Sequence, residues 1–331
     1  MAWRTWREAA EHALYGPGGF YRREQPAGHF RTSVHVSTLF AGAVAQLAEA
    51  CRARTVVDVG AGRGELLVAL RQHGIGSTLV GVDVSPRPPG LPTDVQWTAQ
   101  LPDQLTDVLV IANEWLDDVP VDVVEVDAAG HARLVLVDPA SGAEQLGGEP
   151  DAADVEWLAR WWPLDGAAPS RRAEIGRPRD EAWADVVRRV HDGVVVAVDY
   201  YHLRADRPPF GSLTGYRDGR TVPPIPNGSC NITAHVALDA CEAAGAAAGV
   251  RASLLTTQRQ ALRALGVDAL LPPREFAVSR PREYLDAVAR ASQATELLDP
   301  SGLGRFGWLV QTVGRPLPAP LAAFLPPTRS P

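Results

Sequence analysis

The sequence contains no lysine, because all 32 of its basic residues are arginines. That absence excludes a catalytic or Schiff-base lysine and the lysine of a phosphate-binding P-loop. Cysteine is scarce as well: Cys51, Cys230 and Cys241 are its only examples, and no two of them form a CxxC pair. We therefore expect neither a disulfide framework nor a cysteine-rich zinc cluster, and we predict no metal site.

Long apolar runs and an excess of positive charge are also missing. No stretch of about 18 consecutive apolar residues occurs, so no insertion into a membrane is expected. The first residues lack the apolar core of a secretory signal, which predicts a cytoplasmic protein. The net charge of −7 and the pI of about 5.6 argue against a nucleic-acid partner.

The sequence does contain an alternation of apolar, strand-like runs with helical patterns. At 331 residues and 46% hydrophobic content, the chain can form one large domain or two smaller ones. Buried strands that alternate with helices predict an α/β, Rossmann-like fold with a mostly parallel, seven-stranded sheet covered by helices on both faces. The expected strands span 55–60, 78–85, 95–99, 107–114, 194–201, 250–256 and 306–313.

One strand-to-helix turn has the composition of a cofactor site. In VVDVGAGRGELLVAL (56–70), Gly60, Gly62 and Gly64 stand two residues apart, and Asp83 follows 19 residues after the last glycine. The fingerprint of NAD sites is GxGxxG, whereas G-x-G-x-G is the usual form in S-adenosylmethionine (SAM) sites. An acid at the end of the next strand can accept hydrogen bonds from ribose hydroxyls. The alternative is a tight turn with Asp83 as a strand-end cap.

We accordingly predict SAM as the cofactor. The residues expected to bind it are Asp58, Gly60, Ala61, Gly62, Gly64, Asp83, Val84 and Asn113.

The chain resembles the MidA-like methyltransferases, which include a mitochondrial complex I assembly factor that methylates an arginine. The matching segments are LYGPGGFY (14–21), GHFRTS (28–33), DVGAGRGELL (58–67), VDVSP (82–86), ANEWLDDVP (112–120), VDYY (198–201), GSLTGYR (211–217), NITAHV (231–236), TQRQALRALGV (257–267) and LGRFGWLVQ (303–311). The resemblance implies a class I methyltransferase fold, SAM as methyl donor and an arginine acceptor.

The chain departs from the family pattern at four positions that usually hold acids. His29 and His35 stand where the family has the acids of GDF and TSPE, and Asn231 and Ala237 stand where it has those of DITAHVDF. If some of those acids hold a guanidinium, this protein binds arginine differently. The alternative is that these four substitutions are neutral changes on the protein surface.

We expect the chain to be divided into three structural parts. Residues 1–54 would form an N-terminal helical lid, and residues 55–120 with 183–331 would form the SAM-binding core. Residues 121–182 would be an inserted hairpin and helical subdomain, because 121–137 alternates on both sides of a turn. Residues 202–229 are expected to form a long loop.

The catalytic candidates lie where strand ends and the N-terminal segment should meet the methyl group. Glu114, at the end of the fourth expected strand, could orient a guanidinium, and Asn113 could position substrate or the amino group of SAM. His29 and His35 could accept a proton. The alternative is that Asn113 and Glu114 cap a helix near Trp115, whose solvated first turn would hold the aspartates at 117 and 118.

Aromatic and polar residues elsewhere complete the predicted substrate site. The residues expected to contact substrate are Tyr21, Phe30, Thr32, Ser33, Tyr200 and His235. For the aromatic residues of the N-terminal segment, packing on the core is the alternative to a lid over the sulfonium.

We therefore expect a SAM-dependent methyltransferase that acts on a side-chain nitrogen of a protein or peptide. Two alternatives stay open: a methyltransferase for a small metabolite or natural-product peptide, and a non-catalytic SAM-binding assembly factor. The expected partner is the protein or peptide substrate, and a homodimer is possible.

Overall fold

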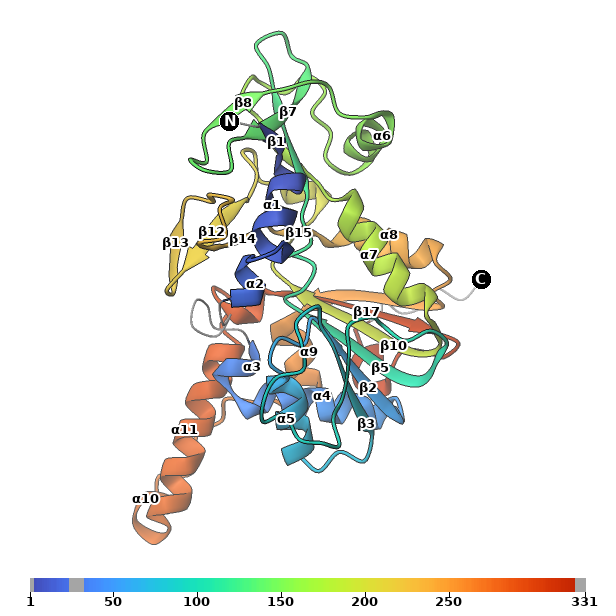
Figure 1. Cartoon of the computed structure of the whole chain (residues 1–331). Coiled ribbons are helices and arrows are strands. Elements are labelled where there is room, and N and C mark those ends of the chain that lie inside the picture. The colour runs from blue at the N-terminus through green and yellow to red at the C-terminus, as the bar shows by residue number, and fades with distance from the viewer. Residues whose placement is uncertain (1–2, 24–32, 325–331) are drawn as a thin grey trace. The chain divides into compact units, whose positions relative to one another are not determined.

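The structure is a computed structural model that describes residues 3–23 and 33–324 (Figure 1). The chain divides into two compact units, and each unit is built from three stretches. The sheet unit comprises 31–113, 189–198 and 250–331, and the hairpin unit comprises 1–30, 114–188 and 199–249. This division differs from the expected one, since 31–54 belong to the sheet unit and 199–249 join the hairpin region.

A seven-stranded sheet in the order β16-β17-β10-β5-β2-β3-β4 forms the sheet unit. The neighbours from β10 to β4 pair in parallel, and β16 pairs with β17 antiparallel. This arrangement confirms the predicted Rossmann-like, mostly parallel sheet. The strands are β2 (Thr55–Val59), β3 (Thr78–Val82), β4 (Gln96–Thr98), β5 (Leu105–Asn113), β10 (Val190–Asp199), β16 (Ala252–Thr257) and β17 (Gly307–Val313).

β-Branched residues build the central strands of this sheet. Val108 to Ala112 of β5 and Val194 to Val198 of β10 are almost wholly buried. Strands of a parallel sheet are covered on both faces, so they consist of continuous apolar runs rather than alternating ones. The expected strand positions are confirmed because this signal is local.

Helices α4 (Thr38–Ala50), α5 (Glu65–Gln72) and α9 (Gln258–Ala264) accompany the sheet (Figure 1). The side chain of Ser37 caps α4, and Thr257 forms a capping box at the start of α9. Such caps satisfy backbone N–H groups that the first helical turn leaves unpaired. The shorter elements of the sheet unit are α3 (Ser33–Val36), η3 (Leu303–Arg305) and α12 (Ala319–Ala322).

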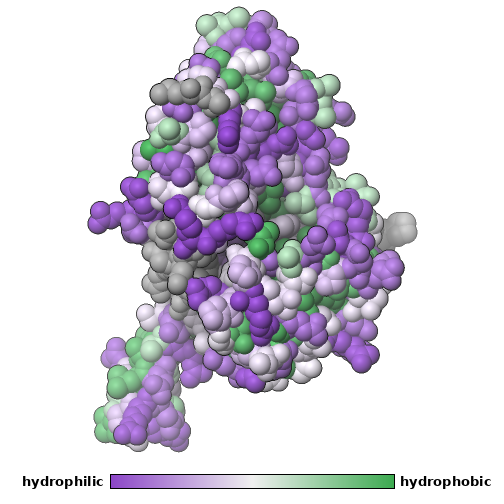
Figure 2. Space-filling model, viewed as in Figure 1, coloured by the Kyte–Doolittle hydropathy of each residue, from purple (hydrophilic) through white to green (hydrophobic). Residues whose placement is uncertain are grey.

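An arm of the sheet unit consists of α10 (Phe276–Ser279) and α11 (Pro281–Leu297). Only the C-terminal half of α11 is buried, through Ala291, Ala294 and Leu297. Figure 2 shows apolar side chains among polar ones on the surface of this arm. The large apolar residues exposed along 268–285 are Leu270, Leu271, Val278 and Leu285.

The hairpin unit is built on an antiparallel sheet in the order β1-β7-β6-β9, with β8 beside β7. β6 and β7 form the hairpin expected at 121–137. Its inner face packs with Trp6, Leu14 and Phe20 of the N-terminal helices. The strands are β1 (Arg4–Thr5), β6 (Asp122–Val126), β7 (Ala132–Val137), β8 (Glu144–Leu146) and β9 (Arg172–Ile175).

The region expected as a long loop, 202–229, contains regular structure, so that expectation was wrong. Its strand β12 (Thr214–Arg217) pairs with β13 (Arg220–Val222) and with the more distant β14 (Asn231–Thr233). Strands this short become stable only through partners, which local composition does not reveal. The region also contains β11 (Tyr201–His202), which pairs with β15 (Val236–Ala237), and η2 (Arg204–Asp206).

The helices that the structure describes in the hairpin unit are α1 (Trp6–Tyr15), α2 (Phe20–Arg23), α6 (Ala152–Trp161), α7 (Arg177–Arg188) and α8 (Leu238–Ala247). Helices α7 and α8 pack against each other. Across 3–23 and 33–324, no helix has both the length and the apolar character needed to cross a membrane.

Candidate functional site

The glycine turn between β2 and α5 has a left-handed backbone at all three glycines. The φ angles of Gly60, Gly62 and Gly64 are +71°, +57° and +78°. Side chains with a Cβ rarely adopt this region. At Gly64 a Cβ would also lie 2.6 Å from Cδ1 of Leu91, so glycine is required there for two reasons. The turn therefore leaves bare backbone at the carboxyl end of β2.

Asp83 follows β3 and is bonded to the same turn. Its Oδ2 accepts a hydrogen bond of 2.9 Å from the Gly62 amide, and its Oδ1 accepts one of 2.7 Å from the Ser85 amide. Each carboxylate oxygen can accept a second hydrogen bond, so both can also receive one from a ligand hydroxyl. Asp83 is half-buried, and the neighbouring Val84 is 58% exposed.

Asp58 lies inside β2 and is 4% exposed. Burial raises the pKa of its carboxyl well above the ordinary value, and the nearby charges of Glu65 and Asp83 raise it further. Three acids thus surround the glycine turn. The charges of Glu65 and Asp83 suit a ligand with hydroxyl donors and a positive charge.

These residues fit SAM better than a dinucleotide. The turn presents backbone in the manner that a ribose and an amino-acid moiety require, and Asp83 has acceptor capacity for the ribose hydroxyls. A dinucleotide would place a pyrophosphate at the amino end of α5, where Glu65 and Asp83 oppose a second anion.

Two further acids stand where the neighbouring strands β5 and β10 end. Val198 of β10 is in register with Asn113 of β5, so Asp199 and Glu114 follow paired positions. Ligands of open parallel sheets bind beyond the carboxyl ends of the strands. Glu114 is half-buried and has a φ of +51°, which is uncommon for a residue with a side chain.

No helix begins at Trp115, so the alternative in which Asn113 and Glu114 cap such a helix is wrong. The aspartates that follow do not lie on a solvated helical turn either. Asp117 is 6% exposed, and its Oδ2 accepts a hydrogen bond of 2.7 Å from the hydroxyl of Thr233. The segment 114–120 is instead a turn stabilised by distant partners.

Asp199 is one of these partners. Its Oδ2 accepts hydrogen bonds from the amides of Leu116 and Asp117, at 3.0 and 3.1 Å. Asp199 is fully buried, and burial together with the charge of Asp117 raises the pKa of its carboxyl well above the ordinary value. Among the described residues, Oδ1 of Asp117 and Oδ1 of Asp199 have no hydrogen-bond partner.

Arg179 of α7 supports the same turn from the opposite side. Its guanidinium is buried and donates to four backbone carbonyls, those of Asp117, Val119, Ala234 and His235, over 2.6–3.1 Å. The guanidinium also lowers the pKa of Asp117 and Asp199, against the effect of burial. Arg179 therefore joins segments 117–119 and 234–235 and supplies positive charge to the acids.

Tyr21 of α2 meets Asp118 and Asn231, which are far apart in sequence. The Tyr21 hydroxyl contacts Oδ2 of Asp118 and lies 3.1 Å from Oδ1 of Asn231. Nδ2 of Asn231 lies 3.2 Å from Oδ1 of Asp118. The sequence singled out Tyr21 as a substrate residue, and the structure places it in a network with the acids of the 114–120 turn.

Tyr200 and His235 are stacked, with ring centroids 5.6 Å apart and planes 14° from parallel. Burial and the charge of Glu114 raise the pKa of the Tyr200 hydroxyl, so it stays protonated. His235 is exposed, and its backbone amide donates to the Ser212 hydroxyl. The structure thus brings these two predicted substrate residues together, and Tyr200 interacts electrostatically with Glu114.

Ser33 is fully buried, which separates it from the other predicted substrate residues. Its hydroxyl lies 3.2 Å from Oε1 and 3.1 Å from Nε2 of Gln258, at the start of α9. His29, Phe30 and Thr32 lie outside the described residues. His35 belongs to α3, but its side chain is not among those described.

Sequence reasoning missed Arg179, Thr233, the burial of Asp117 and the half-buried position of Asp118. Arg179 stands more than 50 residues from each of its carbonyl partners, so no local pattern pointed to it. One weak indication of these residues was present in the sequence, the adjacent pair Asp117–Asp118 soon after a buried strand.

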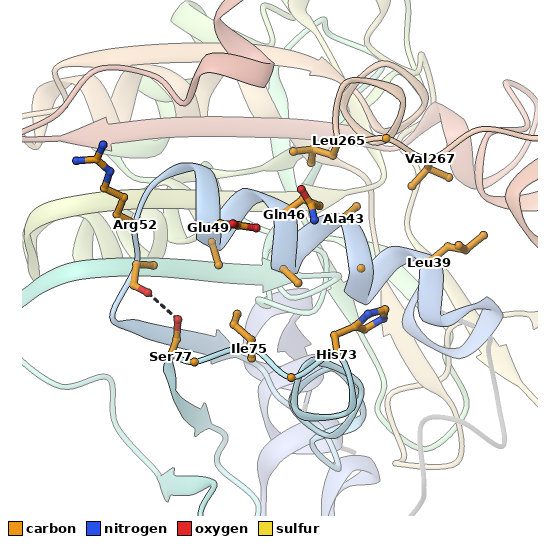
Figure 3. A pocket seen from close by; sticks show the side chains of 17 residues that line it. Leu39, Ala43, Gln46, Glu49, Arg52, His73, Ile75, Ser77, Leu265 and Val267 are labelled. Carbon is orange, nitrogen blue, oxygen red and sulfur yellow. Dashed lines mark hydrogen bonds between the residues drawn. The ribbon is translucent and has the colours of Figure 1, made fainter.

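A groove of about 780 Å³ lies on the sheet unit along α4 (Figure 3). Ala53 and Ser77 line it, and each stands just before a strand, β2 or β3. Its other lining residues include Leu39, Gln46, Glu49, His73 and Leu265. The groove therefore reaches the amino ends of the strands, whereas the glycine turn and Asp83 lie at their carboxyl ends.

Comparisons with known proteins agree with the expected cofactor and enzyme class. A family of S-adenosyl-L-methionine-dependent methyltransferases matches residues 69–256, more than half of the chain. The chain belongs to this family. The family description confirms the expected enzyme class and cofactor, and it states no methyl acceptor. The glycine turn at 60–64 lies outside the matched residues, so its geometry supports the cofactor independently.

Two crystal structures from Burkholderia thailandensis share the fold. One, solved with S-adenosyl-homocysteine bound, is 26% identical with a TM-score of 0.77, and the alignment covers 97% of this chain and 90% of that one. The other, a native structure, is 28% identical with a TM-score of 0.76 and the same coverage. No curated protein matches the chain.

Proposed function

We propose that the protein transfers a methyl group from SAM to a side-chain nitrogen of a protein or peptide, with arginine as the acceptor that the family resemblance implies. The observation that supports this proposal is the order of groups at one edge of the sheet. Of four neighbouring strands, β10 ends on Asp199, and β5, β2 and β3 are followed in turn by Glu114, the glycine turn and Asp83. Cofactor groups and acceptor groups thus follow adjacent strand ends.

SAM, when bound, supplies a methyl group on a positively charged sulfur. The protein must align the acceptor nitrogen with that methyl and exclude water. A carboxylate can accept two N–H bonds from a guanidinium or an amine and fix its direction. Glu114 is the candidate for this contact, because its left-handed backbone sets the direction of its side chain immediately after β5.

The buried acids Asp117 and Asp199 favour a nitrogen acceptor over an oxygen acceptor. Alkylation adds positive charge to an uncharged amine, and Asp117 and Asp199 each keep a buried oxygen without a described partner. Negative charge in a site of low dielectric constant stabilises a positive group more strongly than it would in water. Stacked Tyr200 and His235 could hold the apolar part of an acceptor side chain.

The test measures methyl transfer from isotopically labelled SAM to a panel of acceptors by mass spectrometry. The panel contains arginine-bearing peptides, lysine-bearing peptides and free small amines. In the Glu114→Gln variant we expect unchanged affinity for S-adenosyl-homocysteine and a loss in kcat of about 100-fold, since only the alignment of the acceptor changes. Glu49→Gln is the matched control, because Glu49 is exposed on α4 beside the groove.

Three results would contradict the proposal. Efficient transfer to small amines and not to peptides would favour the small-metabolite alternative. Tight binding of S-adenosyl-homocysteine without transfer to any acceptor would favour the non-catalytic assembly factor. Full activity of Glu114→Gln would remove Glu114 from the acceptor site.

A further inference from the structure

Tyr21, Asp118 and Asn231 form a closed ring of three polar contacts inside the hairpin unit. The hydroxyl of Tyr21 contacts Oδ2 of Asp118, and it lies 3.1 Å from the side-chain oxygen of Asn231. The amide nitrogen of Asn231 closes the ring on Oδ1 of Asp118 at 3.2 Å. Asn231 is 3% exposed, so water contributes little to this ring on its side.

The number of hydrogens in the ring decides the protonation state of Asp118. Three contacts at hydrogen-bonding distance require three hydrogens, one in each contact. Tyr21 supplies one, and the Asn231 amide supplies one more at its nitrogen. An ionised Asp118 supplies none, so one contact would join two oxygens without a hydrogen. A carboxylic acid at Asp118 supplies the third.

This count does not depend on how the amide of Asn231 is oriented. As placed, Asp118 would donate to Tyr21, Tyr21 to the Asn231 oxygen, and the Asn231 amide to Asp118. With the amide turned over, Asp118 would donate to the Asn231 oxygen, and the amide nitrogen would donate to Tyr21. Both arrangements need a proton on Asp118.

We propose that Asp118 is a neutral carboxylic acid in the folded protein, and that its proton completes a ring of three hydrogen bonds with Tyr21 and Asn231. The acidic turn after β5 then carries one negative charge fewer than its aspartates suggest. Asp118 is a specificity-determining residue in this view, because it lowers the negative charge available to an acceptor.

Some groups around Asp118 raise the pKa of its carboxyl, and others lower it. Removal from water and the charge of Asp117 raise the pKa of the Asp118 carboxyl well above its ordinary value. The guanidinium of Arg179 and hydrogen bonds donated by Tyr21 and Asn231 act the opposite way, and the balance favours the protonated form. Tyr15 of α1 donates to the backbone carbonyl of Asp118, so it leaves the carboxyl proton unaffected.

The consequence for the acceptor rests on the proposed function. Glu114 then remains as the acid that attracts a cation, because burial raises the pKa of Asp117 and Asp199 as well. A site with this reduced charge accepts an amine that arrives neutral more readily than a site with an ionised Asp118 would. The Asn231→Asp variant adds an acid to the ring and should shift kcat/KM toward guanidinium acceptors relative to neutral amines.

The first test needs no acceptor and no activity. In Asp118→Asn the new amide can donate to Tyr21 in place of the carboxylic acid, so the ring is preserved without a titrating proton. The wild-type acid stabilises the fold below its unfolded pKa, near 3.9, and this stability is lost as pH rises through the raised folded pKa. The Tm of Asp118→Asn minus that of the wild type should therefore increase by about 2 °C or more from pH 5 to pH 8.

Asp165→Asn is the matched control, because Asp165 is exposed in the same unit. Its Tm should stay close to that of the wild type throughout. If Asp118 were ionised in the fold, the Tm difference for Asp118→Asn would not change from pH 5 to pH 8, because the acid would be ionised in the folded and the unfolded state alike. A flat or falling difference overturns the proposal.

Infrared spectroscopy provides a second measurement that does not rely on the variant's stability. With aspartate labelled with ¹³C at the carboxyl group, the wild type at pH 7 should show a C=O band of a protonated acid that shifts in D₂O. This band should shift in Tyr21→Phe, which removes a hydrogen-bond partner of the acid, and it should be lost in Asp118→Asn. A wild-type spectrum that neither variant changes would contradict the proposal, even if methyl transfer proceeds as proposed.

Discussion

Gly62 and Asp83 are 21 residues apart in the chain, yet the Gly62 amide donates a hydrogen bond of 2.9 Å to the Asp83 carboxylate. The bond ties the turn after β2 to the end of β3 before any ligand binds. The same carboxylate keeps acceptor capacity for the hydroxyls of a ribose. Preorganisation of this kind lowers the entropy that binding must overcome.

Asp83→Ala should weaken the binding of S-adenosyl-homocysteine by about 10- to 100-fold, because a charge-assisted hydrogen bond contributes roughly 1.5–3 kcal/mol. Isothermal titration measures this loss. The control is Asp94→Ala, in which an exposed aspartate paired with Arg71 is removed from the same unit. Unchanged affinity in Asp83→Ala, or tight binding of NAD by the wild type, would show that Asp83 does not contact a ribose.

Gly64→Ala should destabilise the protein by more than Gly74→Ala. Both glycines have left-handed backbones, with φ of +78° and +72°, so both variants incur a backbone cost of about 1–2 kcal/mol. Only at Gly64 would the new Cβ clash, with Leu91 at 2.6 Å, whereas nothing lies within 4 Å at Gly74. Urea denaturation compares the two, and equal midpoints would refute the requirement for close packing at the turn.

Arg179→Met should lower the free energy of unfolding by about 3 kcal/mol, since it leaves buried carbonyls without donors. Four backbone carbonyls accept from the Arg179 guanidinium. Arg188→Met on the same helix is the control, because the Arg188 side chain is 56% exposed. A small effect at Arg179, similar to that of the control, would mean that water replaces the guanidinium.

Asp180→Asn should flatten the pH dependence of stability between about pH 4 and pH 7. Burial raises the pKa of Asp180 from 3.8 to about 7, although Trp157 donates a hydrogen bond of 2.6 Å to its Oδ2. A raised carboxyl pKa contributes stability below the unfolded value, and this contribution is lost as pH rises toward 7. Relative to the wild type, the variant should therefore gain Tm with rising pH, as thermal melts would show.

Asp185→Asn provides the control for this pH effect, because Asp185 lies on the same helix with its side chain about half exposed. Its melts should follow those of the wild type across the range. A Tm difference for Asp180→Asn that does not change between pH 4 and pH 7 would show that Asp180 ionises as an ordinary carboxyl.

Most of the fold could be predicted from the sequence, because its signals are local. The apolar runs of β5 and β10 and the glycine turn at 60–64 each lie within about ten residues of sequence. The order of these segments also predicted at which edge of the sheet the cofactor binds, since parallel strands present their carboxyl ends on one side. The family match confirms the predicted cofactor, and the seven-stranded sheet confirms the predicted fold.

The acceptor side could be predicted only in part. Glu114 was placed correctly at the end of a strand, but the helix near Trp115 that the alternative assumed is a turn in the structure. Local composition could not reveal this turn, because Asp199 accepts from the amides of Leu116 and Asp117 across more than 80 residues. Such partners replace the hydrogen bonds that a helix would have supplied.

By itself the sequence determined the strands, the helices and the glycine turn, since hydrophobic periodicity and backbone preferences act between near neighbours. The tertiary structure alone decided which side chains share a site and in which charge state. Tyr21 meets Asp118 from 97 residues away, and Asn231 meets it from 113. The proton on an acid depends on the donors, charges and exclusion of water around it, and folding is what assembles those surroundings.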